Sequence, residues 1–311
     1  MNSLFYVILS VFSYVILGFV IKKYFNVSSK IISKFDYLSF NILLPIALIT
    51  YFWQINFPSF NTLNLLFVFF GAGIFVFFIG YQIAYYKFKF TVDDSALIGL
   101  ASCFGNSVAL GIPLMHTLFG KLNAMPYMIL VLFHGLVHFT YTTLIIESYR
   151  NRSLKIHKQI LRTFIGLFRN VVLVGIFLGI SLNYFKIPQP TNLLFILNVI
   201  SEIALPCVLL SLGFALASFN LVLSFKRSMI LTFLKNILHP LIAFTISKFL
   251  LNLDELLVMT VTLAAALPSG SQTYYFAFRY NSQKELISSN IVLSTFVSFF
   301  TLSILIILFD F

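Results

Sequence analysis

Long apolar runs occupy most of this sequence. A helix needs about 20 mostly apolar residues to cross the hydrocarbon core of a bilayer, and its backbone groups must hydrogen-bond within the helix because lipid offers no partners. Ten runs that suit such helices lie at Leu4–Ile21, Phe35–Phe52, Leu63–Tyr85, Ala96–Phe119, Pro126–Ile146, Val171–Phe185, Asn192–Ala217, Met229–Leu251, Leu256–Phe278 and Leu286–Phe309. We therefore predict an all-α integral membrane protein with ten transmembrane helices.

The charge content leads to the same class of protein. Only 9% of the 311 residues are charged, and 60% are hydrophobic, whereas a soluble domain carries about 25% charged residues. So few charges cannot cover a water-soluble globule of this size. The abundant apolar side chains also exclude intrinsic disorder, and the two cysteines cannot form a disulfide scaffold.

The net charge of +11 is explained by membrane orientation rather than by a nucleic-acid partner. Sixteen of the 20 Lys and Arg residues lie in loops after odd-numbered spans, whereas only Lys121, Lys186 and Lys248 lie in loops after even-numbered spans. Cytoplasmic loops carry the excess of basic residues, so we predict that the odd-numbered loops are cytoplasmic and both termini are outside. The expected location is a plasma membrane, the inner membrane of a bacterium.

A polar, basic stretch divides the chain into two halves of five spans each. We interpret residues 1–150 as a first five-helix repeat, 151–169 as a basic cytoplasmic linker and 170–311 as a second repeat. A repeat with an odd number of helices enters the membrane in the opposite sense the second time. The predicted fold is therefore a pair of inverted five-helix repeats, which is characteristic of secondary transporters.

The fourth and ninth spans are interrupted by proline, glycine and small polar residues. Proline removes a backbone donor and glycine eases departure from helical geometry, and such breaks at membrane depth occur where they line a cavity. Corresponding breaks in the two halves point to a binding site, although ordinary structural kinks remain the alternative. The candidate substrate-binding residues are Gly105, Asn106, Ser107 and Pro113 in the fourth span, and Pro268, Ser269, Ser271 and Gln272 in the ninth.

Several of these motifs, taken together, resemble the auxin efflux carrier family, including its bacterial members related to malonate permeases. The matching segments are Asn41–Pro45, Gly105-Asn106 with Gly111–Leu114, Pro206–Gly213, Ala266–Pro268 and Ser294–Ser298. The resemblance implies that the fourth and ninth helices cross inside a mobile transport domain, against a scaffold of helices one, two, six and seven. It also implies elevator-like transport of organic anions such as auxin or small carboxylates.

One departure from the family affects proton coupling. The plant carriers have an acidic and a basic residue within the third helix, whereas Leu63–Tyr85 offers only Gln82 and tyrosines. A proton-linked role at that place is therefore not expected to carry over to this chain.

A few polar residues within other spans need separate interpretations. Glu202 is a candidate coupling or gating carboxylate, because a charge inside a membrane helix is costly; its alternative is a structural pair with Lys235 or His239. Asn41 is a second coupling or gating candidate. His134 and His138 lie on one face of the fifth span, where they could line the substrate path, pack between helices or, less favourably, bind a metal.

The sequence thus predicts a secondary active transporter, or permease, for small organic anions, and not an enzyme. No cofactor and no metal are expected. A proton or a sodium ion could be coupled to transport. Membrane lipid surrounds the protein, and a homodimer is compatible with the sequence. The alternatives are a sodium-coupled carrier resembling the bile-acid symporters and a transport-inactive membrane receptor.

Overall fold

The protein folds as a set of helices. The computed structural model describes residues 2–25, 27–55, 62–150, 171–219 and 224–309, and within these ranges it contains helices and one isolated β-type contact but no strand. The predicted all-α class is therefore confirmed for the described residues. The predicted linker 151–169 lies outside them.

Each predicted span is mostly helical, and the spans Ala96–Phe119 and Leu256–Phe278 are each interrupted between two helices. The elements before the linker are α1 (Asn2–Tyr24), α2 (Ser29–Leu38), η1 (Ser39–Leu43), α3 (Leu44–Gln54), α4 (Thr62–Gln82), η2 (Ile83–Lys87), α5 (Val92–Cys103), η3 (Ser107–Gly111), α6 (Ile112–Asn123) and α7 (Met125–Arg150). Those after it are α9 (Val171–Tyr184), α10 (Thr191–Ala217), α11 (Phe225–Phe233), η4 (Leu234–Leu238), α12 (His239–Thr245), η5 (Ile246–Leu250), α13 (Glu255–Ala266), α14 (Gln272–Tyr280) and α15 (Lys284–Leu308). Within the described ranges, six continuous helical stretches are long and apolar enough to cross a membrane, and three shorter helices are also apolar.

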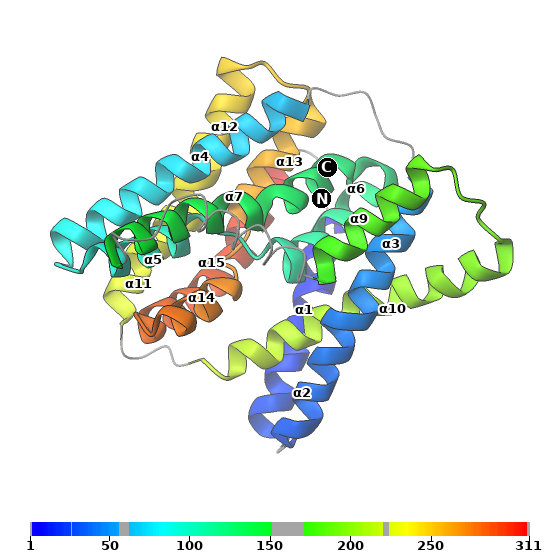
Figure 1. Cartoon of the computed structure of the whole chain (residues 1–311), viewed down its shortest axis with the longest axis horizontal. Coiled ribbons are helices and arrows are strands. Elements are labelled where there is room, and N and C mark those ends of the chain that lie inside the picture. The colour runs from blue at the N-terminus through cyan, green and yellow to red at the C-terminus, as the bar shows by residue number, and fades with distance from the viewer. Residues whose placement is uncertain (1, 26, 56–61, 151–170, 220–223, 310–311) are drawn as a thin grey trace.

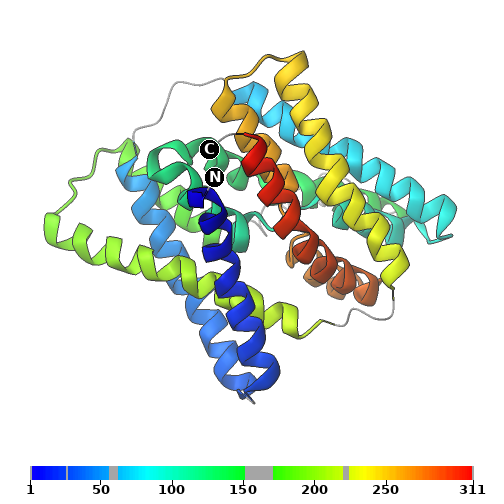
Figure 2. The same cartoon turned by 180° about the vertical axis from the view of Figure 1, so that it is seen from behind.

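The helices form two groups that meet along one boundary (Figures 1 and 2). In the first group α1 packs along α10, α3 packs against both α9 and α10, and α2 leads directly into η1 and α3. In the second group α4, α5, α7 and α11–α15 pack against one another. Helix α6 lies at the boundary, in contact with α1, α10 and α7. The first group corresponds to the helices that the family resemblance assigns to a scaffold.

Close backbone contact holds α1 against α10. A Cβ atom added to Gly213 of α10 would collide with the carbonyl oxygen of Val15, and one added to Gly18 of α1 would collide with the carbonyl oxygen of Leu210. Small residues allow membrane helices to approach this closely, and the gain is van der Waals packing along the whole contact. The α1–α10 pair is therefore a tightly packed unit.

Three prolines each follow a π-helical segment, two residues after its end. The π-helical segments η1, η3 and η4 each end two residues before a proline, namely Pro45, Pro113 and Pro240. In each case the residue just before the proline donates its N–H to the carbonyl five residues back. Proline cannot donate a hydrogen bond and clashes with the carbonyl four residues before it, and a π-bulge is one way for a helix to continue through such a place.

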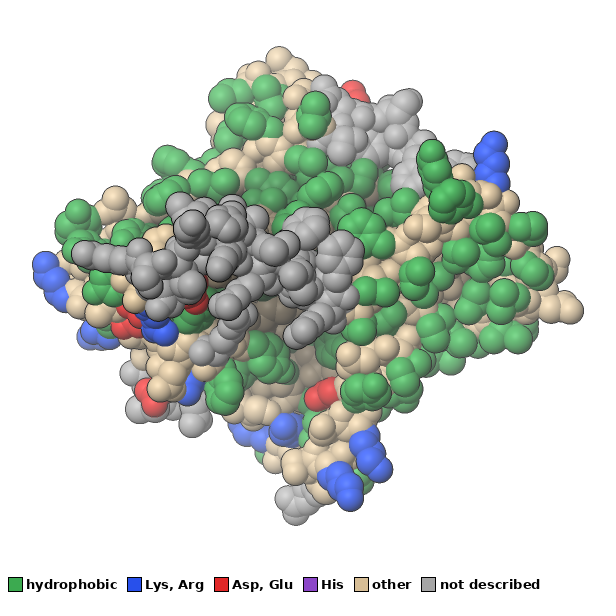
Figure 3. Space-filling view, viewed as in Figure 1, with side chains coloured by type: hydrophobic (Ala, Val, Ile, Leu, Met, Phe, Trp, Pro, Cys, Tyr) green, Lys and Arg blue, Asp and Glu red, His purple; other side chains and the backbone are tan. Residues whose placement is uncertain are grey.

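The outer surface of the helices is strongly apolar. Figure 3 shows hydrophobic side chains over broad areas of α9 and α10, with Lys and Arg side chains towards the edges of the view. Phe177 and Leu178 of α9 and Phe195, Ile196 and Ile203 of α10 are among the exposed large hydrophobic residues. Such a surface suits a lipid surrounding, because exposed apolar area of this extent is unusual on a water-soluble monomer.

Candidate functional site

The two interrupted helices cross each other. Helix α5 ends at Cys103 before η3 starts at Ser107, and α13 ends at Ala266 before α14 starts at Gln272. At the crossing, Gly105 and Ser269 pair in antiparallel fashion. The Asn106 N–H donates to the Pro268 carbonyl at 2.8 Å.

A second backbone bond completes the crossing. The Gly270 N–H donates to the Phe104 carbonyl at 2.9 Å. Each extended segment therefore satisfies backbone groups that the other has freed from helical bonding, which is what burial at membrane depth requires.

Polar side chains stabilise the ends of the broken helices. Ser269 Oγ donates to the Ala101 carbonyl at 3.0 Å, and Asn290 Nδ2 donates to the same oxygen at 3.2 Å. The Ser269 N–H in turn donates to Ser294 Oγ at 3.0 Å. Ala101 lies in the last turn of α5, where carbonyl groups lack intrahelical partners, so these side chains satisfy the end of the first broken helix.

Asn106 starts the second half of the first broken helix. Its Oδ1 atom accepts a hydrogen bond from the Ala109 N–H at 3.2 Å, as an N-cap does. Its Nδ2 atom is fully buried without a hydrogen-bond partner. The Ser107 carbonyl accepts a bond from Tyr127 Oη at 2.6 Å. An unused amide donor therefore lies at the N-terminal, positive end of η3, where a helix favours an anion.

Buried cationic and imidazole groups surround the crossing. His134 Nε2 lies 3.2 Å from the Gly105 carbonyl, and the His134 ring centroid lies 4.2 Å from that of Phe104. His138 Nδ1 lies 2.9 Å from the His134 carbonyl. Lys235 of η4 is fully buried and donates to the Ala265 carbonyl in the last turn of α13. Among the described residues, no three His, Cys, Asp or Glu side chains come together as a set of metal ligands.

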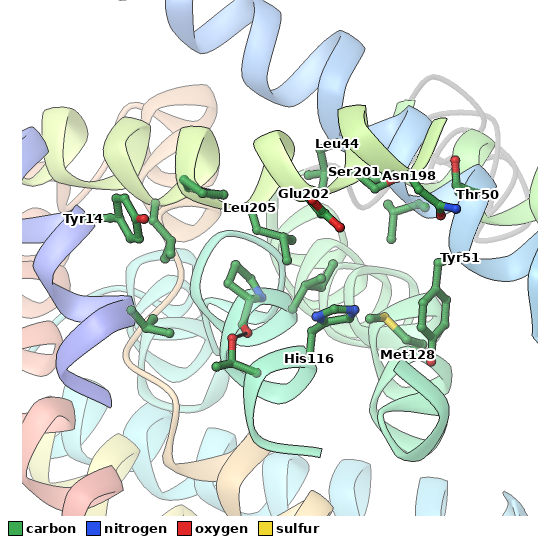
Figure 4. A pocket seen from close by; sticks show the side chains of 18 of the residues that line it. Tyr14, Leu44, Thr50, Tyr51, His116, Met128, Asn198, Ser201, Glu202 and Leu205 are labelled. Atoms are coloured by element: carbon green, nitrogen blue, oxygen red, sulfur yellow. Dashed lines mark hydrogen bonds between the residues drawn. The ribbon is translucent and has the colours of Figure 1, made fainter. Parts of the chain in front are cut away.

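A pocket of about 560 Å³ opens at the boundary between the two helix groups. Helices α1, α3 and α10 form one wall, and α6 with Met128 of α7 forms the other. Figure 4 shows Glu202 of α10 pointing into the pocket and His116 of α6 facing it from the opposite wall. Polar groups from both walls also line this space, namely Thr50, Tyr51, Asn198 and Ser201 from the first helix group and Thr117 from α6.

The predicted site residues fall into three places. Gly105, Asn106, Ser107, Pro268, Ser269, His134 and His138 are buried at or beside the crossing. Pro113 and Glu202 line the pocket. Ser271 and Gln272 are half-buried at the start of α14, and Asn41 is exposed on η1; these three do not line the pocket.

Glu202 lies apart from Lys235 and His239, the two partners that the sequence suggested. Glu202 lies on the pocket wall, whereas Lys235 Nζ contacts the Ala265 carbonyl and lies 3.5 Å from His239 Nδ1. Sequence reasoning missed the placement of Lys235 and of its neighbour Asn236, whose Nδ2 atom donates to the Ala266 carbonyl at 3.3 Å. The available signal was a Lys-Asn pair within an apolar span, since ionisable residues there are usually functional.

Comparison with known proteins shows what kind of protein has this arrangement. The family model described as "Membrane transport protein" matches residues 3–306, nearly the whole chain. The chain belongs to this family. The match confirms the resemblance to the auxin efflux carriers, and it makes the chain a multi-pass membrane transport protein rather than an enzyme.

Two relatives of this membrane transport protein carry related names. A protein of Rhizobium meliloti (strain 1021) named "Putative malonate transporter" is 22% identical over 237 residues, which cover 75% of this chain and 73% of the relative. An uncharacterized transporter of Methanocaldococcus jannaschii is 27% identical over 244 residues, or 76% of each chain. Both relatives are thus named as transporters, and the similarity extends over most of their length.

Proposed function

We propose that this protein is a secondary transporter that moves small organic anions across the plasma membrane by elevator-type alternating access. The observation that carries the proposal is the crossing at Gly105 and Ser269 beside a pocket at the boundary between two helix groups. Crossed, broken helices near the centre of two repeats are the arrangement in which transporters hold their substrates. Membership of a transport family supports the same conclusion.

The proposed architecture is ten transmembrane helices in two inverted repeats. Residues 1–150 and 170–311 would form the repeats, with the basic linker in the cytoplasm and both termini outside. The antiparallel sense of the crossing supports this symmetry, because equivalent segments of inverted repeats run in opposite directions. The second helix group would then move as a transport domain against the first, since few contacts other than those of α1, α6 and α10 join them.

The proposed substrate site extends from the pocket to the N-terminal end of η3. His116 and Thr117 on α6 face Asn198 and Ser201 on α10, so hydrogen-bonding groups are present on both walls. The free Asn106 Nδ2 donor lies at the positive end of η3, whose other end leads into Pro113 on the pocket wall. A carboxylate can be held by such donors together with a helix N-terminus. In the structure Asn106 is fully buried, so we infer that it reaches substrate in another state of the transport cycle.

The substrate class we favour is small carboxylates, with dicarboxylates first. The name of one relative refers to malonate, and a 560 Å³ pocket is ample for a molecule of that size. A thermal-shift screen of the purified protein against mono- and dicarboxylates would select candidates. Uptake of the radiolabelled candidates into proteoliposomes would then measure transport.

Two asparagine variants, one at the crossing and one on the surface, test the assigned substrate site. Asn106→Ala removes the buried amide at the crossing, whereas Asn192→Ala changes an exposed asparagine at the start of α10. We expect Asn106→Ala to lose most carboxylate uptake and Asn192→Ala to keep it. If Asn106→Ala carried every substrate as fast as the wild type, the assigned site would be wrong.

A further inference from the structure

Lys235 lies inside the protein next to the helix crossing. Its side chain is fully buried, and its Cε atom lies 3.7 Å from the position that a Cβ atom would take on Gly105. It belongs to η4, the widened turn that precedes Pro240. A cationic group thus lies within van der Waals distance of the point where the broken helices cross.

The ammonium group of Lys235 occupies the negative end of a broken helix. It donates a hydrogen bond to the carbonyl of Ala265, in the last turn of α13. Beside it, Asn236 Nδ2 donates to the carbonyls of Ala266 and Ser294, both at 3.3 Å. The last carbonyls of a helix lack intrahelical partners and carry partial negative charge. Carbonyls of this kind are the groups with which transporters of crossed-helix design coordinate a cation.

The corresponding end of the other broken helix has only neutral donors among the described residues. The Ala101 carbonyl of α5 accepts hydrogen bonds from Ser269 Oγ and Asn290 Nδ2, and Asn290 Oδ1 is held by Thr232 Oγ1 at 3.1 Å. Among the described residues, the two ends therefore differ in charge, because the Lys235 ammonium lies at the end of α13 and not at the end of α5.

Among the described residues, no carboxylate forms an ion pair with Lys235. Within the described residues, the ion pair found within 4.0 Å joins Arg150 to Asp93, far along the chain from Lys235. The titratable side chains that lie near Lys235 are Cys103 of α5, His134 and His138 of α7, and His239 of α12. Helix α13 presents the Ala265 backbone carbonyl to Lys235, and α15 presents the Ser294 carbonyl to the neighbouring Asn236. A buried ammonium without a counter-ion is costly inside a membrane protein, so its protonation state can change with the state of the site.

We propose that Lys235 is the coupling group of this transporter: its ammonium takes the place of a bound metal cation at the end of α13, and transport is coupled to protons through Lys235 instead of to sodium. The inference rests on the proposed function. When the site faces one side, water delivers a proton to the Nζ atom and gives the ammonium form. When the site faces the other side, Nζ returns that proton to water; His239 Nδ1 lies 3.5 Å from Nζ.

Measurements on the wild-type protein test this proposal first. Proteoliposomes containing trapped pyranine, clamped electrically with potassium and valinomycin, would be given a carboxylate that the protein carries, in sodium chloride or in choline chloride. We expect the same carboxylate flux in both salts and a proton movement that starts with the carboxylate. Dependence on sodium, or carboxylate flux without proton movement, would overturn the proposal. Vesicles that move no carboxylate in any condition would overturn the proposed function itself.

Three lysine variants then test whether Lys235 carries the transported proton. Lys235→Met removes the titrating group, Lys235→Arg retains a permanent charge, and Lys248→Met is the matched control, because Lys248 is exposed on η5 of the same helical stretch. We expect both Lys235 variants to lose the substrate-driven proton signal down to the level of protein-free vesicles, while Lys248→Met keeps it. A folded Lys235 variant, checked by its melting temperature, that still moves protons with substrate would show that another group carries them. The salt and proton measurements on the wild type test proton coupling itself, independently of whether either Lys235 variant folds.

Discussion

The backbones of Gly105 and Ser269 lie side by side and antiparallel, although they belong to opposite halves of the chain. The hydrogen bonds on either side of this pair join Asn106 to Pro268 and Gly270 to Phe104. A change that separates the two backbones breaks both bonds at once and leaves polar groups exposed to an apolar interior, where each unsatisfied group costs several kcal/mol.

The two glycines of the crossing should differ in their tolerance of a methyl group. A Cβ atom at Gly270 would lie 2.9 Å from the Gly105 carbonyl oxygen and 2.8 Å from the Phe104 ring, whereas one at Gly105 would meet its nearest atoms at 3.6 Å. We expect Gly270→Ala to lose about 1–3 kcal/mol of stability, as overpacking typically does, and Gly105→Ala to remain close to wild type. Melting temperatures in detergent measure both. Equal melting temperatures would contradict the tight crossing.

Glu202 should weaken the binding of an anion in the pocket. Its carboxylate points into the space that the substrate would share (Figure 4), and like charges a few ångströms apart in a partly aqueous site repel by about 1 kcal/mol. Glu202→Gln should therefore lower the KM for a dicarboxylate by roughly twofold to tenfold. Glu285→Gln, which changes an exposed glutamate at the start of α15, is the control. An unchanged KM would place the substrate away from Glu202.

The contact between Asp93 and Arg150 should make stability depend on pH. Burial raises the pKa of Asp93, but hydrogen bonds from Thr91 and Arg150 and the charge of Arg150 lower it more, so the net pKa is below the ordinary value. Asp93 precedes the predicted span Ala96–Phe119, and Arg150 Nε donates to its Oδ2 at 2.8 Å. With the folded pKa depressed, the stabilisation is present above the unfolded pKa of about 3.9 and is lost as pH falls through the folded value.

Thermal melts of the wild type and Asp93→Asn measure this effect. Arg150 is more than a third exposed, so solvent screening limits the difference at neutral pH to about 1 kcal/mol. The two melting curves should converge as the pH is lowered below about 3.9. A gap that stayed constant down to the lowest pH at which the protein remains folded would show that the charge of Asp93 contributes nothing.

Replacing glycine by alanine should destabilise the protein where α1 packs against α10 but not at an open position on α4. Gly213→Ala would place a methyl group against the Val15 carbonyl, whereas Gly71→Ala on α4 adds one where no atom lies within 4 Å. We expect Gly213→Ala to reduce the melting temperature and the yield of folded protein. Gly71→Ala should be neutral or raise stability by about 0.5–1 kcal/mol, because alanine suits a helix interior better than glycine. The reverse order would mean that α1 and α10 do not pack in this way.

Sequence reasoning located the helices and their interruptions because both have local causes. An apolar run of sufficient length allows few structures in lipid, and Pro268 and Gly270 mark the second break by their chemistry alone. The positions of Ser271 and Gln272 away from the pocket could not be predicted, because they depend on where α14 begins and how it packs. The contact of Lys235 with Ala265 joins elements that are separate in the sequence, and no local pattern encodes such a pairing.

The distribution of the helices between the two groups has a consequence for biogenesis. Helix α1 from the start of the chain packs along α10, and α5 crosses a segment next to α14. Neither half of the chain therefore contains a complete hydrophobic core, and the ribosome must deliver α10 before the first helix gains its partner. The two halves produced as separate polypeptides should each be unstable in the membrane and be rescued when they are made together. Assembly of this protein is therefore a late event that joins its two halves.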